Sequence, residues 1–262
     1  MPELPEVEAY RRLADERALG RVVAEVMAPD AWYLKGGIDA GAVSSVLVGR
    51  RFETARRIGK LLLLDTSDGG PIVGLRFGMT GRLLVDDNDA VGELLYTSKA
   101  DRPEWDRFAV RFADGGGLRM QDPRRLGGVL LDPSEGRLGV DATTVTPAAL
   151  RAALGPSTAP LKARLMNQAH LAGVGNLIAD EALWRAGLDP RRPASSLTDA
   201  EHRRLHKHLR ASVADLMERG GSHTGDLRPH RSPGGRCPKD GTELQRDTVG
   251  GRTTWWCPKH QR

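Results

Sequence analysis

Cysteine and long hydrophobic runs are both scarce in this sequence of 262 residues. The two cysteines, Cys237 and Cys257, are too few for the disulfide framework of a small secreted protein, but they can contribute to one metal site. No run approaches the roughly 18 apolar residues of a membrane span, and residues 1–15 lack the apolar block of a signal peptide. We therefore expect a cytoplasmic protein without a membrane partner.

Basic residues outnumber acidic ones only slightly in the whole chain, but clearly at its C-terminal end. The sequence holds 39 Lys and Arg against 34 Asp and Glu, which gives a net charge of +5. Residues 202–262 hold 13 basic and 6 acidic side chains, so the excess lies there. Most basic residues are arginines, whose planar guanidinium suits bidentate phosphate contacts. This favours a nucleic acid as partner, although codon bias explains an arginine-rich composition equally well.

The hydrophobic pattern predicts an N-terminal helix, then a β-rich region, then a helical region. The first helix is predicted over residues 5–19. Short apolar runs alternate with turn clusters as far as Asp132, which indicates a β-sandwich or barrel with strands near 22–27, 61–64, 72–77, 108–112 and 129–131. Further helices are predicted over 147–154, 160–169, 177–186 and 198–219. The chain length fits about two domains of roughly 100–200 residues.

The last of these helices has the clearest sequence signals. Thr198 and Glu201 have the spacing of a capping box, and Gly220 can end the helix. Residues 221–236 lack periodicity and are predicted to be a linker or a mobile loop. Residues 237–262 follow as a compact terminal unit.

The N-terminal sequence MPELPEVE offers unusual chemistry. Removal of Met1 would leave Pro2 with a free secondary amine, and α-amino groups titrate near pH 8. Attack of such an amine on a sugar C1′ gives an iminium that cannot lose an N–H proton, which suits cleavage of a C–N glycosidic bond and elimination of both phosphates. Glu3 and Glu6 can protonate the leaving sugar oxygen and orient the site. The alternative interpretation is an ordinary proline at a helix start, followed by acidic residues of the first turn.

Six blocks in order resemble one family. They are MPELPEVE at 1–8, RRIGK ending at Lys60, FGMTG at 77–81, DPRRLGG at 122–128, the long block at 161–194, and GGRTTWWCPKHQ at 250–261. Together they identify the chain as similar to the formamidopyrimidine-DNA glycosylase and endonuclease VIII family of base-excision-repair enzymes. The resemblance implies an α+β multidomain fold that clamps damaged double-stranded DNA, with the protein acting as a monomer in the bacterial cytoplasm. Its parts would be a catalytic N-terminal β-sandwich domain with a flanking helix at 1–134, a helix–two-turn–helix domain at 135–222, and a C-terminal zinc-finger-like β-hairpin at 223–262.

The same resemblance assigns roles to individual residues. Pro2 would be the Schiff-base nucleophile and Glu3 the general acid, while Lys60 and Arg252 would contact phosphate and assist β,δ-elimination. Other residues would bind DNA: Met79, Arg124 and Leu126 by filling the duplex where the nucleotide is flipped out, and Lys162 and Asn176 by contacting phosphate. Asn176, after a glycine-rich turn, can also cap the following helix. Read alone, Lys60 fits a strand edge, Met79 a hydrophobic core, and the glycine turn an ordinary loop.

The terminal unit departs from the family's four-cysteine zinc finger. At the same spacing this chain has Cys237, Asp240, Cys257 and His260. Two thiolates, a carboxylate and an imidazole are all donors that zinc accepts, so we expect one zinc ion here. His230 is an alternative ligand, and a hairpin that folds without metal around its two tryptophans is the alternative to a zinc site.

Further departures concern the lesion. Leu126 replaces the family's phenylalanine wedge, Arg76-Phe77 replaces His-Leu, and Trp105-Asp106-Arg107 replaces the His-Asp-His of the 8-oxoguanine branch. Only 15 residues separate Gly221 from Cys237, where that branch has a longer insertion over the flipped purine. The sequence therefore favours an endonuclease VIII-like range over 8-oxoguanine. A catalytically silent damaged-DNA-binding protein is the alternative function.

Overall fold

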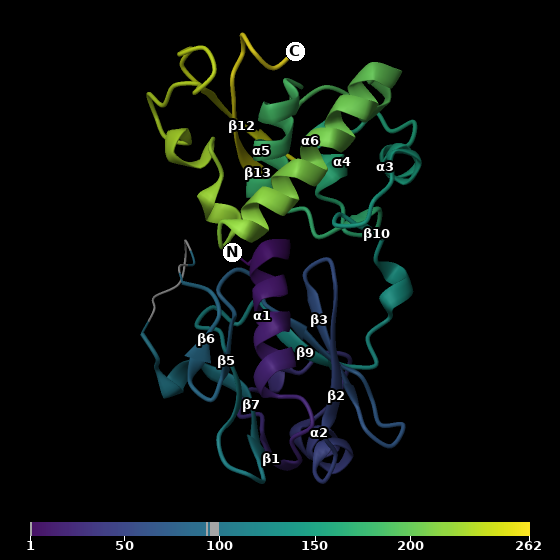
Figure 1. Ribbon diagram of the computed structural model, residues 1–262, viewed down its shortest axis with the longest axis vertical. Coiled ribbons are helices and arrows are strands. Elements are labelled where there is room, and N and C mark those ends of the chain that lie inside the picture. Colours follow the sequence, from purple (N-terminus) through teal and green to yellow (C-terminus); the bar gives the residue numbers. More distant parts are fainter. Residues whose placement is uncertain (1, 93, 95–99) are drawn as a thin grey trace. The chain divides into compact units, whose positions relative to one another are not determined.

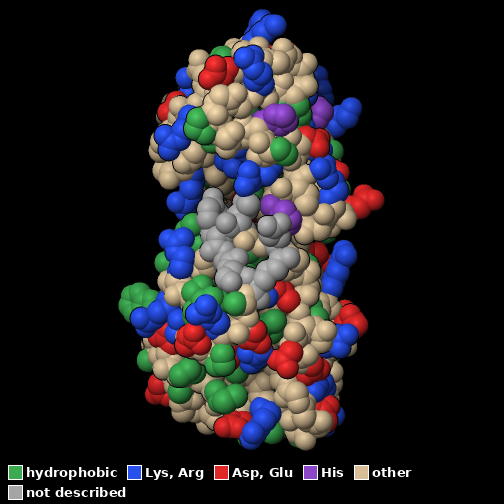
Figure 2. All heavy atoms as spheres, turned by 90° about the vertical axis from the view of Figure 1, so that its left-hand side faces the viewer, with side chains coloured by type: hydrophobic (Ala, Val, Ile, Leu, Met, Phe, Trp, Pro, Cys, Tyr) green, Lys and Arg blue, Asp and Glu red, His purple; other side chains and the backbone are tan. Residues whose placement is uncertain are grey.

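The computed structural model describes residues 2–92, 94 and 100–262. The chain divides into two compact units, Met1–Glu135 and Gly136–Arg262 (Figure 1). Space-filling spheres show Lys and Arg side chains on the visible faces of both units (Figure 2). Within the described residues, no helix is both long and apolar enough to cross a membrane.

The first unit contains two antiparallel sheets. One has the order β2 (Phe52–Ile58), β3 (Leu61–Thr66), β4 (Val73–Arg76) and β9 (Gly128–Leu131). The other has the order β1 (Val23–Met27), β7 (Asp106–Phe112), β8 (Gly117–Gln121), β5 (Arg82–Val85) and β6 (Asn88–Asp89), with the short η2 (Pro103–Trp105) before β7. Apolar side chains from both sheets meet in one core, as the alternating pattern of these strands requires.

Helices cover this β-structure. The helix α1 (Leu4–Arg17) contacts β2, β3 and β5 (Figure 1). Its Tyr10 stacks on Phe77 with ring centroids 4.7 Å apart. The shorter α2 (Ala40–Leu47) begins at Asp39, whose side chain accepts from the third backbone N–H after it, and packs on β1. A single turn, η1 (Ala31–Tyr33), lies between β1 and α2.

The second unit is mainly helical. Its helices are α3 (Pro147–Leu154), α4 (Leu161–Leu165), α5 (Asn176–Ala186) and α6 (Asp199–Glu218), with the turns η3 (Glu135–Arg137) before them and η4 (Ala194–Ser196) before α6. The two-residue strands β10 (Val140–Asp141) and β11 (Leu171–Ala172) pair in parallel. Nearly every residue of α5 is buried, so this helix forms the centre of the unit.

The chain after α6 is packed rather than loose. It forms the turns η5 (Ser222–Thr224) and η6 (Arg228–His230), then the hairpin of β12 (Gln245–Val249) and β13 (Arg252–Trp256). Leu227 is 1% exposed and joins a cluster that includes Trp184 and Trp255. The prediction of a linker or mobile loop at 221–236 was therefore wrong, because apolar and charged side chains of this segment dock on α5.

The predicted fold class is confirmed, and most predicted helices and strands are present. The segment predicted as a helix over 160–169 is helical only at Leu161–Leu165. Sequence reasoning missed α2, β2, β5 and β8. The separate third domain at 223–262 stays a prediction, since the two units divide only near residue 135.

Candidate active site and nucleic-acid interface

The N-terminus of α1 brings three of the predicted catalytic residues together. Pro2 is buried, and Glu3 and Glu6 are 1% and 2% exposed. Glu3 is the N-cap: its backbone N–H donates to Glu6 Oε2 at 2.8 Å, and its own carboxylate accepts from the Glu6 backbone. This capping box fixes the backbone next to Pro2. The structure thus gives Glu6 a positioning contact and sets the Glu3 carboxylate one residue from the amine.

Lys60 lies at the two-residue turn between β2 and β3, where Ile58 pairs with Leu61. The turn is tied to α1 by an ion pair that the sequence did not suggest: Arg57 Nε lies 3.0 Å from Glu8 Oε2, and Arg57 Nη1 donates to the Gly59 carbonyl at 2.9 Å. Burial raises the pKa of Glu8, but hydrogen bonds from Arg57 and Arg11 outweigh it and lower that pKa. The Lys60 turn and the helix that begins beside Pro2 are therefore connected.

Asp122 organises two loops that carry the predicted duplex-filling residues. Its side chain is fully buried and accepts hydrogen bonds from the Thr80 hydroxyl, from the Gly127 N–H at 2.8 Å and from the Arg124 N–H at 3.2 Å. Thr80 follows Met79 in the turn after β4, so one carboxylate serves both loops. Sequence reasoning missed this role of Asp122, which is the first residue of the DPRRLGG block. The available signal was an acidic residue followed by a glycine-containing turn, whose backbone N–H groups need an acceptor.

The loop at 122–128 presents its side chains to solvent. Arg124 is exposed, Leu126 is 50% exposed and Met79 is half-buried, as expected for groups that enter a duplex. Arg125 lies between them in the left-handed region with φ of +56°, and it is held there by two 2.6 Å hydrogen bonds to the Asp30 carboxylate. Its guanidinium lowers the pKa of Asp30.

Arg107, one of the residues that departs from the 8-oxoguanine branch, supports the same loop. Its Nε donates to the Asp122 carbonyl at 2.9 Å and lies 3.8 Å from Asp30 Oδ2. This contact is within the protein, so Arg107 acts here by holding the loop backbone.

In the second unit, Asn176 is the first residue of α5, and Gly175 is the N-cap. The expectation that Asn176 caps the helix was wrong, because no side chain makes that hydrogen bond at the start of α5. Instead, its Oδ1 is buried and has no hydrogen-bond partner among the described residues. An amide with an unsatisfied oxygen at a helix N-terminus can bind a water or present its N–H₂ to an anion.

Lys162 is placed differently from the prediction. Its side chain is fully buried, with Nζ 2.7 Å from Asp180 Oδ1 and 2.7 Å from the Thr254 hydroxyl. Arg231 also lies 2.7 Å from Asp180, through Oδ2. The structure thus gives Lys162 a contact inside the protein, which joins α4 to α5 and β13, and not a surface position open to phosphate.

Arg252 is exposed at the start of β13, directly after the two-residue turn of the hairpin. The turn rests on α4: a Cβ on Gly250, whose φ is +59°, would lie 2.8 Å from Ala163 Cβ. Only glycine fits both this backbone conformation and this close approach. The hairpin tip, and with it the backbone of Arg252, is therefore fixed against the helical part of the unit.

Three of the four predicted metal ligands meet. The donor atoms of Cys237, Asp240 and Cys257 all lie within 4.8 Å of one another. Hydrogen bonds from Thr242, first through its backbone N–H, lower the pKa of Asp240 to about 2, and burial raises the pKa of Cys257. Two thiols and a carboxylate are donors that fit zinc, so three of four positions of a tetrahedral site are in place.

His260 and the alternative ligand His230 are not part of this group, which was sought among the described residues. The Nε2 of His260 is 2.6 Å from the Trp184 carbonyl and 3.2 Å from Lys239 Nζ. The imidazole therefore contacts α5 and lies apart from the metal-binding group. Motif spacing predicted His260 as a ligand because spacing carries no information about this contact.

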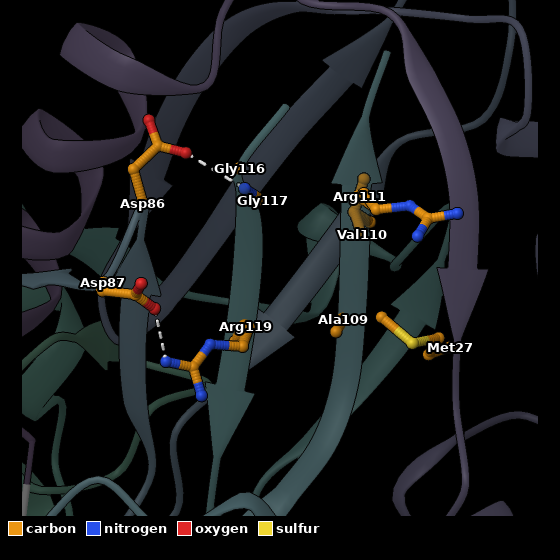
Figure 3. A pocket seen from close by; sticks show the side chains of 9 residues that line it. All are labelled: Met27, Asp86, Asp87, Ala109, Val110, Arg111, Gly116, Gly117 and Arg119. Atoms are coloured by element: carbon orange, nitrogen blue, oxygen red, sulfur yellow. Dashed lines mark hydrogen bonds and ion pairs between the residues drawn. The ribbon is translucent and has the colours of Figure 1, made fainter. Parts of the chain in front are cut away.

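A shallow pocket of about 190 Å³ lies elsewhere, on the five-stranded sheet (Figure 3). Its lining includes Arg119, which pairs with Asp87 at 2.6 Å, and Arg111, which pairs with Glu25 outside the pocket. None of its lining residues is a predicted site residue. Because its guanidinium groups already have carboxylate partners, this pocket offers no uncompensated charge to a ligand.

Known proteins resemble the chain along its whole length. Residues 1–129 match the formamidopyrimidine-DNA glycosylase N-terminal domain, and residues 138–227 match the formamidopyrimidine-DNA glycosylase H2TH domain. The chain is 34% identical to the formamidopyrimidine-DNA glycosylase of Chloroflexus aggregans over 98% of both chains. It is 35% identical to that of Thermus thermophilus over 100% of this chain and 98% of the relative.

Solved structures agree with this resemblance. Lactococcus lactis Fpg in a complex with DNA containing an abasic site covers 100% of both chains with a TM-score of 0.84 and 25% identity. The predicted resemblance is confirmed: the chain belongs to the formamidopyrimidine-DNA glycosylase family and is a DNA glycosylase that acts on damaged DNA, in a family that also has abasic-site lyase activity.

Proposed function

We propose that this protein excises oxidised bases and cleaves the strand at the resulting abasic site through an imine formed by Pro2. The observation that carries the proposal is the start of α1, where a proline precedes two buried acids joined in a capping box. Removal of Met1 makes the amine available. The amine attacks C1′, the base leaves, and the iminium acidifies the sugar protons so that the 3′ and then the 5′ phosphate are eliminated.

We assign the other roles from the family resemblance, and the positions of the residues support them. Glu3, adjacent to Pro2, protonates the sugar oxygen as the ring opens. Lys60 lies on the turn tied to α1, and Arg252 is exposed at the hairpin tip. Both neutralise the charge of DNA phosphates, including those eliminated in the reaction. Asn176 presents its amide to a phosphate at the N-terminus of α5. Met79, Arg124 and Leu126 fill the duplex after the nucleotide is flipped out.

We propose an endonuclease VIII-like substrate range, in which oxidised pyrimidines, ring-opened lesions and abasic sites are preferred over 8-oxoguanine. The support is the segment between α6 and Cys237. Glu181 accepts the backbone N–H groups of Asp226 and Leu227 at 3.2 and 2.9 Å, and Arg231 binds Asp180. This short segment is committed to α5, so little chain is left to cover a flipped purine.

We also propose that the cluster of Cys237, Asp240 and Cys257 holds one zinc ion, which would cross-link the base of the hairpin. The protein would act as a monomer in the bacterial cytoplasm, where its genomic DNA substrate lies. Elemental analysis of the purified protein and of Cys257→Ser measures the metal. A zinc content near one per chain that is lost in the variant supports the site, and a metal-free wild type contradicts it.

The catalytic proposal is tested by borohydride trapping on duplexes that contain an abasic site, 8-oxoguanine or an oxidised pyrimidine. We expect a covalent adduct with the processed protein, none with Pro2→Gly, and the weakest signal on 8-oxoguanine. A dominant 8-oxoguanine adduct would contradict the proposed range but not the mechanism. Damage-dependent binding without any adduct would favour a silent damaged-DNA-binding protein, which shares this fold but does not need Pro2 and Glu3.

A further inference from the structure

Trp32 is the most exposed large hydrophobic side chain among the described residues. It is 67% exposed, compared with 44% for Met27, 45% for Val48 and 50% for Leu126. A single exposed apolar residue is common on protein surfaces. Trp32 differs because an indole has a large flat face and because the backbone beneath it is firmly held.

The turn η1 fixes the base of the Trp32 side chain. The backbone N–H of Trp32 donates to Asp30 Oδ1 at 3.1 Å, and the next two residues, Tyr33 and Leu34, are buried. Lys35 Nζ donates to the Trp32 carbonyl at 2.6 Å and lies 4.7 Å from the centre of the indole. The aromatic ring is thus presented to solvent by an ordered turn, with a cation beside it.

This turn is attached to the loop that carries Leu126, on both sides of that residue. Before it, Arg125 makes its two hydrogen bonds to Asp30. After it, the Lys35 N–H donates to the Val129 carbonyl at 2.8 Å, and a Cβ on Gly128 would lie 2.6 Å from Lys35 Cε. Trp32 and Leu126 therefore belong to one bonded framework, and both present apolar surface to solvent.

We propose that Trp32 and Lys35 are a further part of the DNA interface, in which the indole packs on a base or deoxyribose beside the gap filled by Leu126 and the Lys35 ammonium contacts the adjoining phosphate. The positive charge around Trp32 favours DNA as the partner of this surface. Arg124 and Lys35 are basic, while Asp30, the acid of this framework, is already neutralised by Arg125. Aromatic stacking accepts any base, so this contact raises affinity without reading sequence. The inference rests on the proposed role of the Leu126 loop.

The test measures binding of the full-length protein to a duplex with a tetrahydrofuran abasic analogue. We expect Trp32→Ala to weaken binding by about tenfold, as for the loss of one stacked base, and Trp32→Phe to retain most of it. Lys35→Met should reduce the salt dependence by about one phosphate contact. Val48→Ala is the control, because it removes another exposed apolar side chain, 45% exposed, outside this framework. Trp32→Ala, Trp32→Phe and Val48→Ala should unfold at the wild-type temperature, since these side chains are exposed.

Fluorescence provides a second readout. Of the five tryptophans, Trp184, Trp255 and Trp256 are at most 8% exposed and Trp105 is half-buried, so Trp32 is the one most open to acrylamide. DNA should protect the wild type from quenching and leave Trp32→Phe almost unchanged. Wild-type affinity in Trp32→Ala together with undiminished quenching would overturn the inference, as would an effect on self-association alone. If Leu126→Ala and Arg124→Ala also bind normally, the proposed role of the loop itself fails, which separates the two conclusions.

Discussion

Replacing Asp122 by alanine removes one acceptor from three donors at once. The Thr80 hydroxyl and the Gly127 N–H are buried, whereas the Arg124 N–H is half-exposed and can turn to water. A buried donor left without a partner costs about 1–3 kcal/mol. We therefore expect Asp122→Ala to lower the free energy of unfolding of the first unit by about 3–4 kcal/mol, a large part of a typical domain stability of about 5–15 kcal/mol.

The carboxylate joins two loops, so its loss should loosen both. Hydrogen exchange, followed by mass spectrometry, should accelerate in peptides that cover 77–81 and 122–128, while the α1 peptides change little. Thr80→Val removes only the hydroxyl donor and should accelerate exchange mainly at 77–81. Urea unfolding of both single variants and the double variant then gives the coupling of Thr80 with Asp122, which we expect to exceed about 1 kcal/mol.

The functional consequence is measured on the same variants. The proposed filling of the duplex by Met79 and Leu126 requires that their loops keep their shape. Binding to an abasic duplex should therefore weaken more in Asp122→Ala than in Thr80→Val. Faster exchange confined to 122–128 in Asp122→Ala would refute the idea of a shared support. Additive free energies of unfolding in the double variant would refute it as well.

Three other changes test separate contacts. Hydrogen bonds from Arg192 and from Thr198, the cap of α6, lower the pKa of Glu201 from 4.5 to about 2. The ionised Glu201 therefore stabilises the fold above pH 4.5, and this stabilisation is lost as the pH falls toward 2. The melting temperatures of wild type and Glu201→Gln should differ at pH 7 and converge in acid. Lys162→Met leaves Asp180 with less compensation in the interior, so urea unfolding should show the second unit destabilised by about 3 kcal/mol; equal midpoints would contradict this. Gly78 has φ of +56°, and a Cβ added there would overlap the backbone of Leu126. Gly78→Ala should therefore weaken binding to the abasic duplex and lower the melting temperature, and normal values for both would exclude a steric role for this glycine.

Local signals predicted the elements whose sequence and environment agree. The capping box of Thr198 and Glu201 starts α6 where expected, and the run Leu61–Leu64 is a fully buried part of β3. The strand β2 was missed because three of the seven residues in its sequence, FETARRI, are charged and only two of its side chains are buried. The helix α2 was missed because small and β-branched residues give it a weak helical pattern.

The site shows the same limit at the level of side chains. Motif spacing identified Cys237 and Cys257, whose sulfur atoms do lie together with Asp240, but it also implied His260. The ring of His260 binds the carbonyl of Trp184, 76 positions away, and no local pattern predicts that contact. Likewise, Lys162 is buried against a strand about 90 positions further along the chain. Residue type and spacing indicate which groups are available, and tertiary packing decides which of them face a ligand.

Two different kinds of contact hold the hairpin that carries Arg252, one near each end of β13. At one end, Thr253 and Thr254 of β13 receive hydrogen bonds from Lys162 and Arg231 of the buried ion-pair network. At the other end, Cys257 belongs to the cluster that can bind a metal. Loss of the metal would release only the second support, so we expect the arginine end to keep its place. If the cluster binds the proposed zinc ion, metal supply would change the rigidity of one end of the hairpin only, while contacts inside the protein would keep Arg252 in position.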